Sequence, residues 1–88
     1  MIRRRVVVHG RVQGVFFRDA TRRLANQHGV AGWVANRPDG AVEAVFEGPE
    51  AAVERMLRFA ADGPRGAEVE RVEVSEEEPE GVTGFAVR

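Results

Sequence analysis

A strand, a helix and a second strand are predicted twice in succession along this chain of 88 residues, and the repetition limits the folds open to it. Consecutive valines mark the first strand, and helical spacing of apolar residues marks both helices. The predicted strands lie at 3–9, 31–37, 41–47, 69–74 and 85–87, and the predicted helices run from 17 or 18 to 28 and from 49 to 62. Because the first strand is apolar at consecutive positions, we expect it to be central and covered on both faces or nearly so.

Turn signals indicate how these elements connect. The Pro-Asp-Gly turn at 38–40 has hairpin chemistry, so the second and third strands should pair antiparallel. The apolar alternation changes parity around Glu70 and Arg71, which predicts a bulge or a late start in the fourth strand, and residues 76–81 are expected to form a solvated acidic turn. With right-handed crossovers, the order βαββαβ predicts an α+β, ferredoxin-like sandwich: an antiparallel sheet of four to five strands with two helices on one face.

Composition restricts the class of protein. A length of 88 residues with 43% hydrophobic residues predicts a single domain, 1–88. The chain has no cysteine, which excludes disulfides and thiolate chemistry and favours a cytoplasmic location. The run Val6-Val7-Val8 is too short for a signal or membrane segment, so we expect no membrane partner. A net charge of -1 argues against a general nucleic-acid binder, so we expect no nucleic-acid partner either. We expect a monomer. All thirteen basic residues are arginine, which removes Schiff-base chemistry.

The junction between the first strand and the first helix has the features of an anion site. Residues 10–18 read Gly-Arg-Val-Gln-Gly-Val-Phe-Phe-Arg. A loop with two glycines that enters a helix can turn several backbone N–H groups toward one point, where the positive end of the helix dipole also lies. Arg18 adds a planar fork of donors that matches two phosphate oxygens. From the loop alone, the alternative is a strand-to-helix turn with an incidental surface arginine.

Few other residues could perform chemistry. There is no cysteine, lysine or tyrosine, and the only serine, Ser75, precedes an acidic run with no histidine near it in sequence. His9 and His28 lack a third ligand motif, so we expect no metal site. The carboxylates are scattered, and Asp19, the one beside the loop, is better suited to stabilising the first turn of the helix.

A site of backbone amides and one arginine suits a phosphoryl transfer whose leaving group needs no help. A carboxylate is such a leaving group, because its conjugate acid has a pKa of about 4. Acyl phosphates are therefore the expected substrates. The attacking water needs orientation, and of the two asparagines, Asn26 and Asn36, the candidate is Asn36 because it precedes the hairpin turn. By itself, an asparagine before Pro-Asp-Gly is also ordinary turn chemistry.

The two segments together resemble the acylphosphatase family, whose signatures take the form G-x-V-Q-G-V-x-F-R and G-x-V-x-N-x-x-D-G-x-V-E. Residues 10–18 match the first signature and residues 32–43 match the second at every specified position. The resemblance implies hydrolysis of acyl phosphates to carboxylate and inorganic phosphate, without metal or cofactor. It matches Arg18 to the family's substrate-binding arginine and Asn36 to its water-orienting asparagine. The corresponding phosphate-binding loop, acting through its backbone, comprises Arg11, Val12, Gln13, Gly14, Val15, Phe16 and Phe17.

Some residues near the two signatures are expected to have structural and not chemical roles, and three alternative functions stay open. Gln13 and Phe17 are expected to shape the loop or the core, and Trp33 to pack at the edge of the domain.

A ferredoxin-like RNA binder is disfavoured because Glu43 and Glu47 on the third strand repel phosphates. A second alternative is a module of a larger machine, such as the N-terminal domain of carbamoyl-transferring hydrogenase-maturation proteins; the absence of zinc-finger cysteines favours the free enzyme. A third is a catalytically idle homologue, against which the intact Arg18 and Asn36 weigh.

Overall fold

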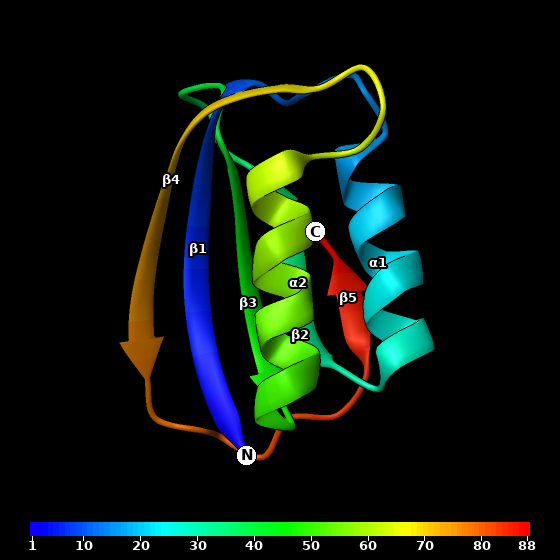
Figure 1. Cartoon of the computed structure of the whole chain (residues 1–88), viewed down its shortest axis with the longest axis vertical. Coiled ribbons are helices and arrows are strands. Elements are labelled where there is room, and N and C mark those ends of the chain that lie inside the picture. The colour runs from blue at the N-terminus through cyan, green and yellow to red at the C-terminus, as the bar shows by residue number, and fades with distance from the viewer.

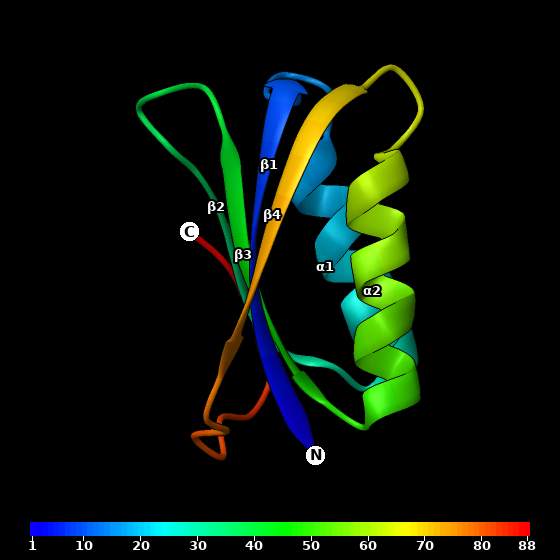
Figure 2. The ribbon, with the colours of Figure 1, turned by 60° about the vertical axis from the view of Figure 1, so that its left-hand side comes forward.

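Two helices cover one face of a five-stranded sheet in the computed structural model, which describes residues 1–88 (Figures 1 and 2). The elements are β1 (Ile2–Arg11), α1 (Phe17–His28), β2 (Ala31–Asn36), β3 (Val42–Gly48), α2 (Glu50–Asp62), β4 (Glu68–Glu77) and β5 (Phe85–Val87). The strand order is β4-β1-β3-β2-β5. The α+β ferredoxin-like fold is therefore confirmed. One detail was wrong, because β5 pairs parallel with β2 and the sheet is not wholly antiparallel.

The hydrophobic core lies between the sheet and the helices. Val6 and Val8 of β1 and Phe46 of β3 point into it, because alternate residues of a strand share a face. Val53 and Met56 of α2 meet them at helical spacing. Neither helix has the length and hydropathy needed to cross a membrane.

The face of the sheet without helices carries ion pairs instead of a second apolar layer. β1 is central, as expected, but the expectation that it is covered on both faces or nearly so was wrong: Arg3 and Arg5 alternate with the core residues and lie on the open face. Arg5 pairs with Glu43 and Glu77, each at 2.6 Å. The aliphatic stems of such arginines cover apolar surface while their charged ends find partners, so a run of valines does not require a second layer of helices.

One ion pair on this face is almost completely buried. Arg3 contacts Glu47 at 3.1 Å, with side-chain exposures of 6% and 2%, and Glu77 at 2.9 Å. The Glu47 carboxylate also accepts hydrogen bonds from the backbone N–H groups of residues 80–82. The expected solvated turn at 76–81 was thus wrong in part: residues 76 and 77 end β4, and the segment that follows is fastened to β3 by Glu47.

A bulge in β4 lies where β1 enters the loop, as the change of parity predicted. The register between β1 and β4 shifts between His9 and Gly10, which leaves Glu70 as the extra residue. Gly10 has a φ of 130°, and a Cβ placed on it would lie 2.2 Å from the carbonyl oxygen of Glu68. Only glycine permits the two strands to approach so closely here.

Replacing Glu47 by glutamine should destabilise the protein in a pH-dependent way. Removing one member of a buried pair costs about 3 kcal/mol, and we expect the free energy of unfolding at pH 7, measured in urea, to fall by about this amount. Hydrogen bonds from the Glu80 backbone and from Arg3 hold the pKa of Glu47 below its usual range despite burial. Its charge therefore stabilises the fold above the unfolded pKa of about 4.3, and this contribution is lost as pH falls through the lower pKa of the folded state.

The difference between wild type and Glu47→Gln should accordingly be constant above about pH 5 and narrow below about pH 4. Glu76→Gln is the matched control, because Glu76 is exposed at the same end of the sheet and makes no ion pair. A difference that did not change with pH would contradict the role given to the Glu47 charge.

Candidate active site

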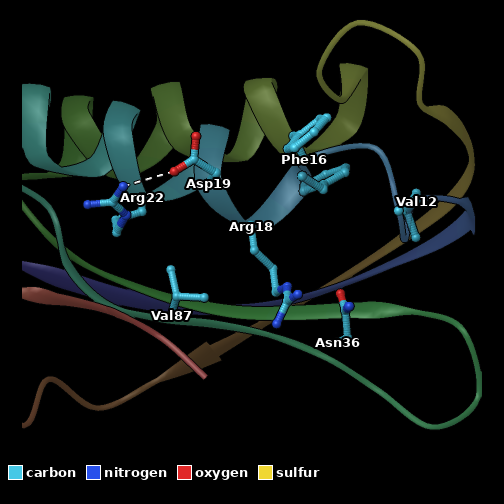
Figure 3. Close-up of a pocket in the computed structure, with 9 residues that line it drawn as sticks. Val12, Phe16, Arg18, Asp19, Arg22, Asn36 and Val87 are labelled. Atoms are coloured by element: carbon cyan, nitrogen blue, oxygen red, sulfur yellow. Dashed lines mark hydrogen bonds and ion pairs between the residues drawn. The ribbon is translucent and has the colours of Figure 1, made fainter.

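The loop after β1, the first turns of α1 and the ends of β2 and β5 enclose a pocket of about 610 Å³ (Figure 3). It is lined by Val12, Gly14, Phe16, Phe17, Arg18, Asp19, Arg22, Asn36 and Val87. The structure thus brings Arg18 and Asn36, which are eighteen positions apart in the chain, to one place. In Figure 3 the Arg18 side chain reaches from α1 toward the sheet and ends beside Asn36.

The loop backbone is free to bind a ligand. No backbone N–H group of residues 12–16 donates a hydrogen bond within the protein. Gly14 has a φ of 73° and Phe16 a φ of 60°, both left-handed, and alternation of this kind turns successive N–H groups toward one side. The positive end of the α1 dipole lies at the same point. A left-handed conformation at a bulky residue such as Phe16 costs about 1 to 3 kcal/mol, so the surrounding structure must hold it in place.

Arg18 is the basic residue that the pocket leaves without an acidic partner. Its Nη1 donates to the carbonyl oxygen of Arg88 at 3.2 Å and to no carboxylate. Asp19, the only acid in the pocket, instead contacts Arg22 at 2.8 Å and Arg23 at 3.0 Å. These two hydrogen bonds hold the pKa of Asp19 below its usual range, so this carboxyl is ionised and already paired. The remaining donors of the Arg18 guanidinium can therefore bind an anion.

Asn36 is exposed as the last residue of β2, and its side chain takes no part in the adjacent turn. The turn at 38–40 is closed by the backbone and by the Asp39 carboxylate, which accepts from the N–H of Ala41 at 3.1 Å. The ordinary turn-forming role that the sequence left open for Asn36 is thus filled by Asp39. The amide of Asn36 can contact a ligand or a water in the pocket.

Gln13 connects the loop to the hairpin that carries Asn36. Its Nε2 donates to the carbonyl oxygens of Arg37 at 2.8 Å and Ala41 at 2.9 Å. These bonds agree with the loop-shaping part expected of Gln13. The residue type alone did not predict its partners, because they come from a hairpin more than twenty positions away.

Three of the expected loop residues, Arg11, Gln13 and Val15, do not line the pocket. Arg11 ends β1 and contacts Glu68 at 3.0 Å, and Val15 packs against the core. Phe17 is buried at the start of α1, with its ring edge-on to that of Phe59 at 5.9 Å between centroids.

Two residues that line the pocket were missed from the sequence, namely Arg22 and Val87. Arg22 follows Arg18 by one helical turn, so the helical spacing alone could have predicted that both side chains lie on the same face of α1. Val87 reaches the pocket through the parallel pairing of β5 with β2, which no local sequence pattern predicts. No group of three or more histidine, cysteine, aspartate or glutamate side chains gathers anywhere in the chain to hold a metal ion.

The comparisons with known proteins agree with this arrangement. The acylphosphatase family model matches residues 4–87. An acylphosphatase of Gloeobacter violaceus is 57% identical over 86 residues, which are 98% of this chain and 92% of that protein. The crystal structure of acylphosphatase from Bacillus subtilis superposes with a TM-score of 0.95 at 38% identity and covers 100% of this chain and 99% of its own. The crystal structure of full-length HypF in its phosphate- and nucleotide-bound form superposes with a TM-score of 0.91 at 25% identity. The match covers 99% of this chain but only 12% of the HypF chain. The chain belongs to the acylphosphatase family of enzymes.

Replacing Gln13 by leucine should loosen the pocket and destabilise the fold modestly. The variant keeps a side chain of similar size but loses both Nε2 hydrogen bonds, while the carbonyl oxygens of Arg37 and Ala41 keep their backbone donors. Two lost hydrogen bonds should lower the free energy of unfolding by about 1 to 3 kcal/mol. The affinity for inorganic phosphate, measured by calorimetry, should fall as well, because the loop is no longer fastened to the hairpin. Gln27→Leu, on the exposed side of α1, is the control. Unchanged phosphate affinity in a destabilised Gln13→Leu protein would show that Gln13 supports the fold and not the site.

Proposed function

We propose that the protein hydrolyses acyl phosphates to a carboxylate and inorganic phosphate in the pocket between α1 and the sheet, with no metal ion. One observation carries this proposal. The unpartnered N–H groups of residues 12–16, the Arg18 guanidinium without an acidic partner and the free amide of Asn36 all lie at one pocket. Membership of the acylphosphatase family supports the same reaction.

The phosphate group of the substrate is held by the loop amides and by Arg18. In phosphoryl transfer, negative charge spreads over the three equatorial oxygens, and preorganised N–H donors stabilise it in the transition state. Arg18 supplies two parallel donors, whereas the carbonyl oxygen of Arg88 keeps the guanidinium turned toward the pocket. Because the loop conformation is fixed before the substrate binds, little reorganisation is needed at the moment of reaction.

Asn36 orients the attacking water. Its Oδ1 accepts a hydrogen bond from the water, whose oxygen forms the new bond to phosphorus while the bond from phosphorus to the acyl oxygen breaks. The carboxylate leaves with the bonding electron pair. One hydrogen of the water stays on the new phosphate oxygen, and the other passes as a proton to a second phosphate oxygen or to solvent. A carboxylate leaving group needs no protonation at neutral pH, so the site needs neither a general acid nor a metal ion.

A turnover assay tests this reaction directly. An aryl acyl phosphate and an aryl phosphomonoester are compared at equal concentration in the presence of a chelator. We expect rapid hydrolysis of the acyl phosphate and negligible hydrolysis of the ester, because only the first has a leaving group that departs unaided. Preference for the ester, or loss of activity on chelation, would contradict the proposal.

Arg18→Lys keeps the charge but loses the bidentate geometry. A charge-assisted hydrogen bond contributes about 1.5 to 3 kcal/mol, so kcat/KM for an acyl phosphate should fall by one to two decades. Competitive inhibition by inorganic phosphate should weaken in parallel. Arg23→Lys is the matched control, because Arg23 is on the same helix and exposed. A lysine variant with nearly full activity would show that Arg18 is only a surface charge.

Asn36→Ala should affect a different step. If the amide positions the water and makes few contacts with the bound phosphate, kcat should fall by about two to three decades while phosphate inhibition stays near that of the wild type. Stability should fall by no more than about 1.5 kcal/mol, because the turn is closed by Asp39. Asn26→Ala, on exposed α1 surface, controls for the substitution itself. A variant that kept its kcat would remove Asn36 from the mechanism.

A further inference from the structure

Phe16 is an aromatic residue at a position where neither the backbone nor the core requires one. Its φ of 60° is a conformation that glycine or asparagine adopts with less strain. Its side chain is 82% exposed. The other aromatic residues beside the core are paired, Phe17 with Phe59 and Phe46 with Phe85, and Phe16 has no such partner. A residue that is both strained and unburied must be explained by something outside the fold.

Its place in the pocket indicates what the ring contacts. Figure 3 shows Phe16 on the helix side of the pocket and Asn36 on the sheet side, with the Arg18 guanidinium next to Asn36. In a phosphoryl transfer the attacking and leaving oxygens lie roughly in line on opposite sides of the phosphorus. A water held by Asn36 approaches from the sheet side. The acyl group of the substrate therefore leaves toward the helix side, where the Phe16 ring is exposed.

We propose that the Phe16 ring forms a binding surface for the acyl group of the substrate and selects acyl phosphates with a flat, apolar, and in particular aromatic, acyl group over those with a small one. This proposal rests on the proposed function. The ring is rigid, so little conformational entropy is lost when an acyl group stacks against it. The strained backbone at Phe16 fixes the direction of the ring as well as that of the loop N–H groups.

The test compares benzoyl phosphate with acetyl phosphate in wild type and in Phe16→Asn. Asparagine tolerates the left-handed backbone, so the loop conformation is retained while the ring is removed. The quantity compared is the ratio of the two kcat/KM values, because any change in the phosphate cradle affects both substrates and cancels. An aromatic contact of ordinary strength should make this ratio about three- to tenfold higher in wild type than in Phe16→Asn. Phe16→Tyr, which keeps the ring, should retain the wild-type ratio.

An unchanged ratio in Phe16→Asn would overturn the proposal, whether or not both rates fall, because a residue that only shapes the loop affects the two substrates equally. A ratio lowered as much by Phe16→Tyr as by Phe16→Asn would also overturn it, since the ring itself would then be irrelevant. Failure of the wild type to hydrolyse either substrate is a different result, and it would remove the proposed function on which the acyl surface rests.

Discussion

The backbone between β1 and α1 has to hold a fixed shape while its N–H groups remain unbonded, and the rest of the structure supports this requirement. A buried or rigid segment normally satisfies its own N–H groups, so residues 12–16 must be held by contacts that use other atoms. Gln13 provides such a contact through two backbone carbonyls of the next hairpin. Gly10 allows the β4 bulge beside the loop, and the buried ring of Phe17 fixes the start of α1.

The ion pairs on the open face of the sheet act on the same site from a distance. Glu47, paired with Arg3, accepts hydrogen bonds from residues 80–82 and so fixes the segment that leads into β5. β5 then pairs with β2, and the carbonyl oxygen of Arg88 just beyond it accepts a hydrogen bond from Arg18. A buried ion pair adds little net stability compared with apolar packing. Here its effect is positional, because it helps to determine where Arg18 lies.

The sequence predicted those parts of the structure that depend on local pattern. Helix ends at Gly29 and Gly63, the hairpin at 38–40 and the parity change at Glu70 follow from backbone preferences of nearby residues. The parallel pairing of β5 and the partners of Glu47 were missed, since they depend on the register of strands far apart in the chain. The two motifs singled out Arg18 and Asn36, and the fold places both in one pocket, while their roles in catalysis stay a prediction. The strained, exposed ring of Phe16 had no signal, because its side chain gives no indication of a left-handed backbone.

The central claim is that phosphate is bound by the free amides of the loop. Nuclear magnetic resonance of the isotopically labelled protein, titrated with inorganic phosphate, tests it most directly. We predict shift changes at the backbone amides of residues 12–16 and at the Arg18 side chain, with scalar couplings between these amide nitrogens and the phosphorus across the hydrogen bonds. Loop amides that stayed unperturbed at saturating phosphate, with changes confined to the exposed arginines Arg22 and Arg23, would contradict the account.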